Sequence, residues 1–194
     1  MRENTTRESQ EMNESTVVER VTRETQIRLE LRRGEGKCDA KTGLDFLDHM
    51  MTTFARYSGL DMTLHADGDL KHHLIEDVAI ATGTAVSRLA GGTIARYGNR
   101  TIPMDDALVH VCVDLGGRPY YRGPLPSSLY DHWMRSFADN ARATLHVRVL
   151  RGSDRHHIVE AAFKALALAI ADAMVASDGG AAFSTKGDVS LEIE

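Results

Sequence analysis

Hydrophobic and polar residues alternate along several stretches of the chain, which predicts strands with one buried face. In residues 17–33, Ile27, Leu29 and Leu31 alternate with charged neighbours, and we expect a strand bent near Thr22, with a turn at residues 34–36. The same alternation predicts further strands at residues 60–66, 107–115, 119–122 and 143–150.

Apolar residues recur at helical spacing between these strands. In residues 44–58, Phe46, Met50 and Phe54 fall on one side of a predicted helix, and Gly59 is suited to end it. Similar stripes predict helices at residues 128–140 and 156–176, and one ending at residue 89 that begins at Leu70 or His72. We expect residues 91–104 to form a linker and residues 177–194 a tail with a short strand-like end.

A cluster of imidazole and carboxylate side chains occurs twice. His72-His73 followed by Glu76 recurs 84 positions later as His156-His157 followed by Glu160, and an Asp-His pair precedes each cluster at positions 48–49 and 131–132. One ancestral unit is therefore present twice. We expect an α+β fold, internally duplicated, in which each half is a small sheet with two helices packed on one face. The predicted limits are 1–16 for a disordered extension, 17–95 for the first repeat and 96–194 for the second repeat with its tail.

Composition narrows the functional classes. The 194 residues are 42% hydrophobic and carry a net charge of −5, which suits a folded chain and argues against a nucleic-acid partner. No apolar run is long enough for a membrane span or a signal peptide. Cys38 and Cys112 form no paired motif and are expected to be reduced core thiols. We therefore expect a cytoplasmic protein.

The duplicated clusters have the chemistry of metal ligands, because imidazole and carboxylate bind divalent transition metals. Residues at i and i+4 share a helix face, so each Glu can meet the first His of its doublet, whereas the second His points roughly 100° away. Each doublet should therefore serve two ions, at sites between repeats or subunits. The expected ligands are His49, His72, His73, Glu76, His132, His156, His157 and Glu160. Two ions would share these eight groups, and Mn²⁺, Fe²⁺ or another divalent ion would keep open positions for catalysis.

Other polar residues give weaker indications of a function. His65, His110 and His146 are expected to be ordinary solvated or hydrogen-bonded histidines. Cationic and hydroxyl groups in turn-like segments can converge on a phosphate. The candidate phosphate ligands are Arg96, Arg118, Ser184 and Lys186.

Several ordered motifs resemble imidazoleglycerol-phosphate dehydratase of histidine biosynthesis. They are Leu47-Asp48-His49-Met50, the His72 and His156 clusters, Pro103-Met104-Asp105-Asp106-Ala107-Leu108, Gly117-Arg118-Pro119, Phe163-Lys164-Ala165 and Ser184-x-Lys186-Gly187. The resemblance implies trimers assembled into a 24-subunit homo-oligomer, with two Mn²⁺ ions where subunits meet. It also implies that Glu24 and Lys164 face the substrate and that the four phosphate candidates hold its phosphate.

The implied reaction is loss of water from imidazole glycerol phosphate to give imidazole acetol phosphate. Metal binding to the ring nitrogens would favour an imidazolate whose electrons expel the neighbouring hydroxyl. A base then removes a proton, and Glu24 and Glu160 are both candidates. Three positions depart from the usual family pattern near the expected substrate contacts, namely Lys71, Thr53 and Tyr57.

Two other functions fit the same residues. A dinuclear metal hydrolase acting on a phosphate ester would use the same ions and cations. A metal-storage or metal-stabilised assembly would need closed coordination and no phosphate ligands.

Overall fold

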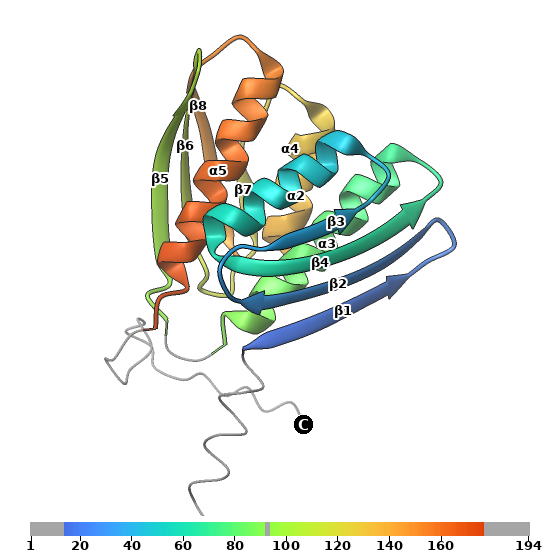
Figure 1. Cartoon of the computed structure of the whole chain (residues 1–194). Coiled ribbons are helices and arrows are strands. Elements are labelled where there is room, and N and C mark those ends of the chain that lie inside the picture. Colours follow the sequence, from blue (N-terminus) through green and yellow to red (C-terminus); the bar gives the residue numbers. More distant parts are fainter. Residues whose placement is uncertain (1–13, 92–93, 177–194) are drawn as a thin grey trace, which may run out of the picture.

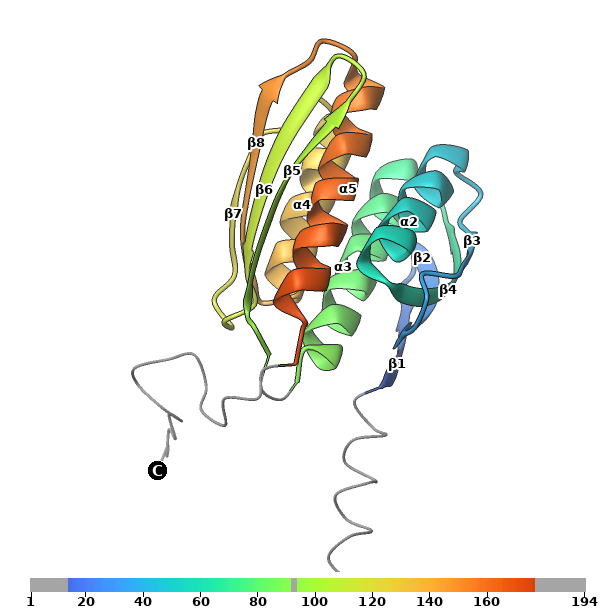
Figure 2. The ribbon, with the colours of Figure 1, turned by 60° about the vertical axis from the view of Figure 1, so that its left-hand side comes forward.

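The computed structural model describes residues 14–91 and 94–176. Two four-stranded sheets lie on the outside of this part of the molecule, and its helices lie between them (Figures 1 and 2). The first half comprises β1 (Ser15–Val21), β2 (Thr25–Arg33), β3 (Cys38–Lys41), α2 (Asp45–Ser58), β4 (Leu60–Gly68) and α3 (Lys71–Leu89). The second comprises β5 (Tyr97–Met104), β6 (Ala107–Asp114), β7 (Tyr120–Arg122), α4 (Ser128–Asn140), β8 (Thr144–Arg151) and α5 (Arg155–Ala173).

The two halves have the same topology. Strand order is β1-β2-β4-β3 in one sheet and β5-β6-β8-β7 in the other. In each sheet the last strand of that order pairs in parallel with its neighbour, and the remaining pairs are antiparallel. The predicted α+β fold, with a duplicated unit of one small mixed sheet and two helices, is confirmed.

The sheets bury one face because their strands alternate. In β2, Ile27, Leu29 and Leu31 are buried while the residues between them are exposed. A strand with this period must turn its apolar side to the helices. Gly59 ends α2 in a left-handed conformation with φ 71°, which glycine adopts without a Cβ clash.

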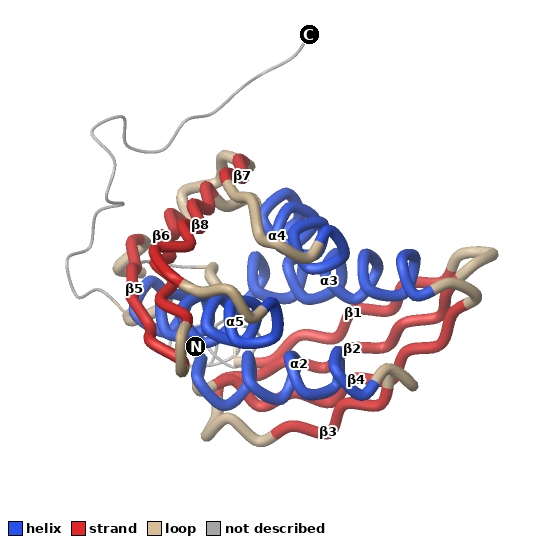
Figure 3. Tube along the Cα trace, turned by 90° about the horizontal axis from the view of Figure 1, so that it is seen from above, coloured by secondary structure: helices blue, strands red, loops and turns tan. Residues whose placement is uncertain are grey.

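One core joins the two halves. Helices α2 and α5 pack against each other, as do α3 and α4, so the contact between halves is helix against helix (Figure 3). At its centre Trp133 stacks on Phe137 with centroids 5.3 Å apart and also meets Phe163 and Phe54. All four rings are fully buried. The helices are therefore held rigidly enough to fix side chains that reach from one half to the other.

The structure differs from the sequence prediction in several elements and boundaries. The strand predicted over residues 17–33 is a hairpin, because the Thr22 hydroxyl accepts hydrogen bonds from the backbone N–H groups of Glu24 and Thr25 and closes a turn. Strand β1 begins at Ser15, so the last two residues of the predicted extension pair with β2. Most of the predicted 91–104 linker is the edge strand β5, and β3 lies in a segment with no predicted element.

These elements were missed for a physical reason. Strands β3 and β5 lie at sheet edges, where few side chains need to be apolar, so their sequences carry little alternation. The rest of the predicted extension, residues 1–13, and the tail at residues 177–194 lie outside the described residues. None of the helices in the described ranges has the length and apolarity that crossing a membrane would need.

Gly98 lets β5 lie directly against α5. A Cβ built at Gly98 would overlap the backbone carbonyl of Ala169. We therefore expect Gly98→Ala to lower the free energy of unfolding by about 1–3 kcal/mol, the usual cost of overpacking. Chemical denaturation would measure this, with Gly43→Ala as a control because no atom lies within 4 Å of a Cβ there, although its positive φ carries a smaller strain. Equal losses in the two variants would contradict the packing argument.

Candidate metal centre

Helices α2 and α4 each carry an aspartate in the first turn, directly before the histidine of the predicted Asp-His pair. Asp48 accepts hydrogen bonds from the backbone N–H and the hydroxyl of Thr42, at 2.9 and 2.7 Å. Asp131 accepts from the backbone N–H of Leu125 at 2.8 Å and from the hydroxyl of Tyr121 at 2.6 Å. Each aspartate ties the preceding loop to its helix and so fixes the position of the histidine that follows.

His49, His156 and Glu160 form a group that we call the α2–α5 triad. Oε2 of Glu160 lies 3.2 Å from Nε2 of His49 and 3.3 Å from Nε2 of His156. Glu160 is only 6% exposed, whereas both imidazoles reach solvent. The first half thus supplies one member of the triad and the second half supplies two.

His72, Glu76 and His132 form the α3–α4 triad. Oε2 of Glu76 lies 3.5 Å from Nε2 of His72 and 3.3 Å from Nε2 of His132. Here the first half supplies two members and the second half one. The expected i, i+4 pairing is confirmed in both clusters, and each pair is joined by a histidine from the opposite half.

The second histidine of each doublet points away from its neighbour. The ring planes of His72 and His73 are 80° apart, and those of His156 and His157 are 89° apart. Neither His73 nor His157 belongs to a triad with its doublet partner. The divergence expected from helical geometry is therefore confirmed.

His73 faces two carboxylates in the turns next to the start of β2 and the end of β4. Its Nδ1 lies 2.9 Å from Oδ1 of Asp69 and 3.5 Å from Oε2 of Glu24. The hydrogen bond with Asp69 raises the pKa of His73 and lowers that of Asp69. Glu24 is thus brought beside one of the predicted ligands.

His157 has a matching environment in the second half. Its Nδ1 lies 2.8 Å from Oδ1 of Asp106, and its Nε2 lies 3.4 Å from Oδ2 of Asp105. The hydrogen bond with Asp106 raises the pKa of His157. Backbone N–H groups of Ser153 and Asp154, together with His157, hold the pKa of Asp106 well below its usual range.

Lys164 holds the buried carboxylate of the α2–α5 triad. Its Nζ lies 2.9 Å from Oε1 of Glu160, on the opposite oxygen from the two histidines. Burial alone would raise the pKa of Glu160, but hydrogen bonds from Lys164 and His49 outweigh it, and the pKa lies below its ordinary value. Tyr57, one of the positions that depart from the family pattern, has its ring 5.7 Å from the same Nζ.

Each triad fits a divalent transition metal. It offers two imidazole nitrogens and one carboxylate oxygen, all within 4.8 Å of one another. Mixed nitrogen and oxygen donors of this kind suit Mn²⁺, Fe²⁺ and Zn²⁺. Three protein donors also leave room for further ligands around such an ion.

Two of the four expected phosphate ligands, Arg96 and Arg118, lie far from the triads within one chain. The backbone N–H of Arg96 bonds to the carbonyl of Ala173 at the end of α5, which is about 25 Å along that helix from His156. The Arg96 side chain forms two hydrogen bonds to Asp114, at 2.6 and 3.0 Å. Arg118 is exposed beside Thr144, also at the end of the second sheet remote from His156. The other two candidates, Ser184 and Lys186, lie outside the described residues.

The roles of three aspartates were missed in the sequence. Asp105 and Asp106 occur in one of the motifs given above without an assigned role, and Asp69 was not singled out. Asp69 stands four residues before His73, a spacing that could have been read as a helical contact. Asp106 is separated from His157 by 51 residues, and only the fold brings them together.

Comparison with known proteins identifies the family. The model of the imidazoleglycerol-phosphate dehydratase family matches residues 42–170, about two thirds of the chain. The dehydratase of Salinispora tropica is 44% identical over 201 aligned residues, covering 91% of this chain and 99% of the relative. The chain belongs to the imidazoleglycerol-phosphate dehydratase family. The Clostridium botulinum strain 657 dehydratase is also 44% identical, over 81% of this chain and 88% of its own.

Solved structures agree with this assignment. The crystal structure of the Pyrococcus furiosus dehydratase matches with a TM-score of 0.80 and 40% identity, over 89% of this chain and all of that one. The Staphylococcus aureus dehydratase matches with a TM-score of 0.77 and 32% identity, over 84% and 99% of the two chains. The protein is therefore an enzyme, a carbon-oxygen hydro-lyase of histidine biosynthesis that acts on a small molecule.

Proposed function

We propose that this enzyme dehydrates D-erythro-imidazole glycerol phosphate to imidazole acetol phosphate, using two divalent ions, Mn²⁺ in the cell. The observation that carries the proposal is the pair of triads, each with two imidazoles and one carboxylate drawn from both halves. Because the two triads offer the same kinds of donor atoms, we infer that each binds one ion of the same kind. When bound, these ions supply a Lewis acid for the nitrogens of the substrate imidazole.

His73 and His157 complete the ion sites of neighbouring copies in this proposal. Neither ring belongs to a triad of its own chain, and each lies nearly perpendicular to the ring of its doublet partner, which supports ligation of ions held elsewhere. Large apolar side chains are exposed close by, with Leu70 57% exposed just before α3 and Leu150 45% exposed near the end of β8. These features support a homo-oligomer of trimers assembled into a 24-mer. We also propose a cytoplasmic location, which the free thiols of Cys38 and Cys112 support.

An intersubunit site also accounts for the distant arginines. Arg96 and Arg118 lie at the end of the second sheet remote from His156, so in one chain they cannot reach a substrate beside a triad. We propose that these arginines, with Ser184 and Lys186, bind the phosphate of a substrate whose imidazole lies at another copy's triads.

We propose Glu24, rather than Glu160, as the base that removes the carbon-bound proton. Glu160 is buried and already engaged by His49, His156 and Lys164. Glu24 has a side chain 56% exposed, on the β1–β2 turn beside His73. A carboxylate in that position can approach a substrate and take its carbon-bound proton after the hydroxyl has been expelled, and passing that proton to the departing hydroxide gives water. Lys164 then acts by holding Glu160 in the orientation that the triad needs.

Incubation of the Mn²⁺-loaded protein with imidazole glycerol phosphate tests the proposed reaction. Formation of the ketone without release of inorganic phosphate is the expected result. Phosphate release would instead support the metal-dependent hydrolase, and absence of both products would contradict the proposed function. The family assignment already favours the dehydratase over the hydrolase and storage alternatives.

His157→Ala is expected to reduce both metal content and assembly size. Removing an interfacial ligand should weaken the ion site and the contact between copies that the ion stabilises. Metal analysis and light scattering would measure the two effects. His65→Ala is the matched control, because His65 is exposed on the outer face of β4. A full-size His157→Ala assembly with full metal content would contradict interfacial ligation.

A further inference from the structure

In both halves, Nδ1 of the second histidine of the doublet forms a hydrogen bond with an aspartate. His73 Nδ1 lies 2.9 Å from Asp69, and His157 Nδ1 lies 2.8 Å from Asp106. Because an ionised carboxylate only accepts hydrogen bonds, each imidazole donates its Nδ1–H. The same ring nitrogen is therefore occupied in both halves.

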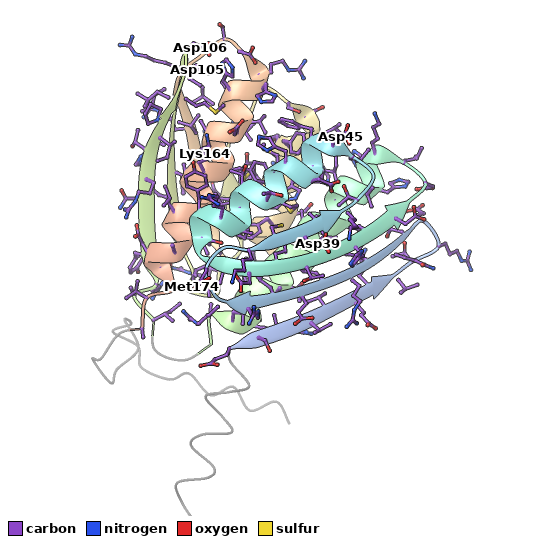
Figure 4. All side chains as sticks on the ribbon, viewed as in Figure 1. Asp39, Asp45, Asp105, Asp106, Lys164 and Met174 are labelled. Atoms are coloured by element: carbon purple, nitrogen blue, oxygen red, sulfur yellow. The ribbon has the colours of Figure 1, made fainter. Side chains whose placement is uncertain are left out.

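The two aspartates do not correspond in the repeat. Asp69 lies in the turn before α3, four residues ahead of His73, and the 84-residue offset places Ser153 at its position in the second half. Asp106 instead comes from the β5–β6 turn, as Figure 4 shows at the tip of that hairpin above the start of α5. The backbone N–H and hydroxyl of Ser153 donate to Asp106 at 2.6 and 3.0 Å. A carboxylate thus reaches the same imidazole nitrogen from a different part of the chain.

We propose that Asp69 and Asp106 are positioning residues that fix the tautomer and ring orientation of His73 and His157. With Nδ1 protonated and held, Nε2 carries the lone pair and is the nitrogen presented to an ion. A carboxylate on the far nitrogen also makes the imidazole a stronger ligand. This inference rests on the proposed function, in which both histidines ligate metal. Their aspartates would tighten metal binding without touching the ion.

A rival explanation is a third ion held by Glu24, Asp69 and His73, whose donor atoms lie within 4.8 Å of one another. The second half argues against it. There Asp106 lies at Nδ1 of His157 and Asp105 at Nε2, on opposite edges of the ring. One ion could not take both carboxylates with that imidazole. The feature common to both halves is the hydrogen bond from Nδ1 to aspartate.

Asp69→Asn and Asp106→Asn test the inference through Mn²⁺ affinity, measured by calorimetric titration of the metal-free protein. Each is expected to raise the Kd for Mn²⁺ by about tenfold to a hundredfold, the usual effect of losing such a carboxylate. Asp69→Ala should raise it further than Asp69→Asn, because the amide oxygen still accepts from Nδ1–H. The melting temperature of metal-free Asp69→Asn should stay close to that of the parent. Asp39→Asn is the control, because Asp39 is an exposed aspartate on β3 that pairs with Lys41 (Figure 4).

The outcomes separate this inference from the proposed function. His73→Ala should lose one equivalent of ion, and its retention of both would contradict the proposed ligand set. If His73→Ala loses an ion while Asp69→Asn binds Mn²⁺ as tightly as the parent, only the positioning role is overturned. If Asp69→Asn binds one Mn²⁺ ion fewer than the parent at saturating Mn²⁺, Asp69 is itself a ligand, and the positioning role is also overturned. Asp106 also accepts hydrogen bonds from the turn before α5. If Asp106→Asn fails to fold, the Mn²⁺ affinity of Asp69→Asn alone tests the positioning role.

Discussion

Glu160→Gln is expected to lower kcat/KM for imidazole glycerol phosphate by about a thousandfold, with loss of one of two ions per subunit. Glu160 is the carboxylate of the α2–α5 triad and touches His49, His156 and Lys164. A bound metal contributes several kcal/mol of transition-state stabilisation, and each 1.4 kcal/mol is worth about a factor of ten in rate. Steady-state kinetics and metal analysis of the same preparation would measure both effects.

Glu30→Gln is the matched control for this variant, because Glu30 is exposed on the outward face of β2. It should keep the parent's rate and both ions. A Glu160→Gln enzyme with two tightly bound ions would show that the triad is not a metal site. A slow enzyme that retains both ions would assign Glu160 a role in proton transfer instead.

Glu24→Gln is expected to lower kcat by about 10²–10⁴-fold, with both ions retained. The reason is that a general base contributes a factor of this size, and the neutral amide cannot accept the substrate's proton. Glu24 is exposed on the β1–β2 turn and belongs to neither triad. In this variant kcat should therefore fall while the metal content stays unchanged, whereas in Glu160→Gln both should fall.

Glu19→Gln gives the control from the same hairpin, since Glu19 is exposed on β1 and paired with Arg28. We expect its kcat to match that of the parent. If Glu24→Gln keeps the parent's kcat, another group removes the proton. If it loses an ion, Glu24 is a ligand beside His73 and not the base.

The repeated parts of the fold could be read from the sequence because they obey local periodicity. Helix α4 matches its predicted range, and Gly59 ends α2 as expected. The edge strands β3 and β5 could not be read in this way. In β5 only Gly98 is buried. The turn at Thr22 depends on a hydroxyl in a stretch that still alternates.

The composition of each triad was only partly predictable. Helical spacing identifies Glu76 with His72 and makes the doublets diverge, because those relations are local. Spacing cannot say that His132 joins Glu76, since that contact depends on α4 packing against α3. The partners of His157 depend in the same way on a hairpin 51 residues away. Long-range contacts of this kind follow from the fold and from no short motif.

Anomalous X-ray scattering from crystals of the Mn²⁺-loaded enzyme tests the central claim most directly. We predict two manganese peaks per subunit, one bounded by His49, His156 and Glu160 and the other by His72, Glu76 and His132, each also contacted by His73 or His157 of a neighbouring copy. Crystals of active enzyme with no manganese peak at either triad would contradict it.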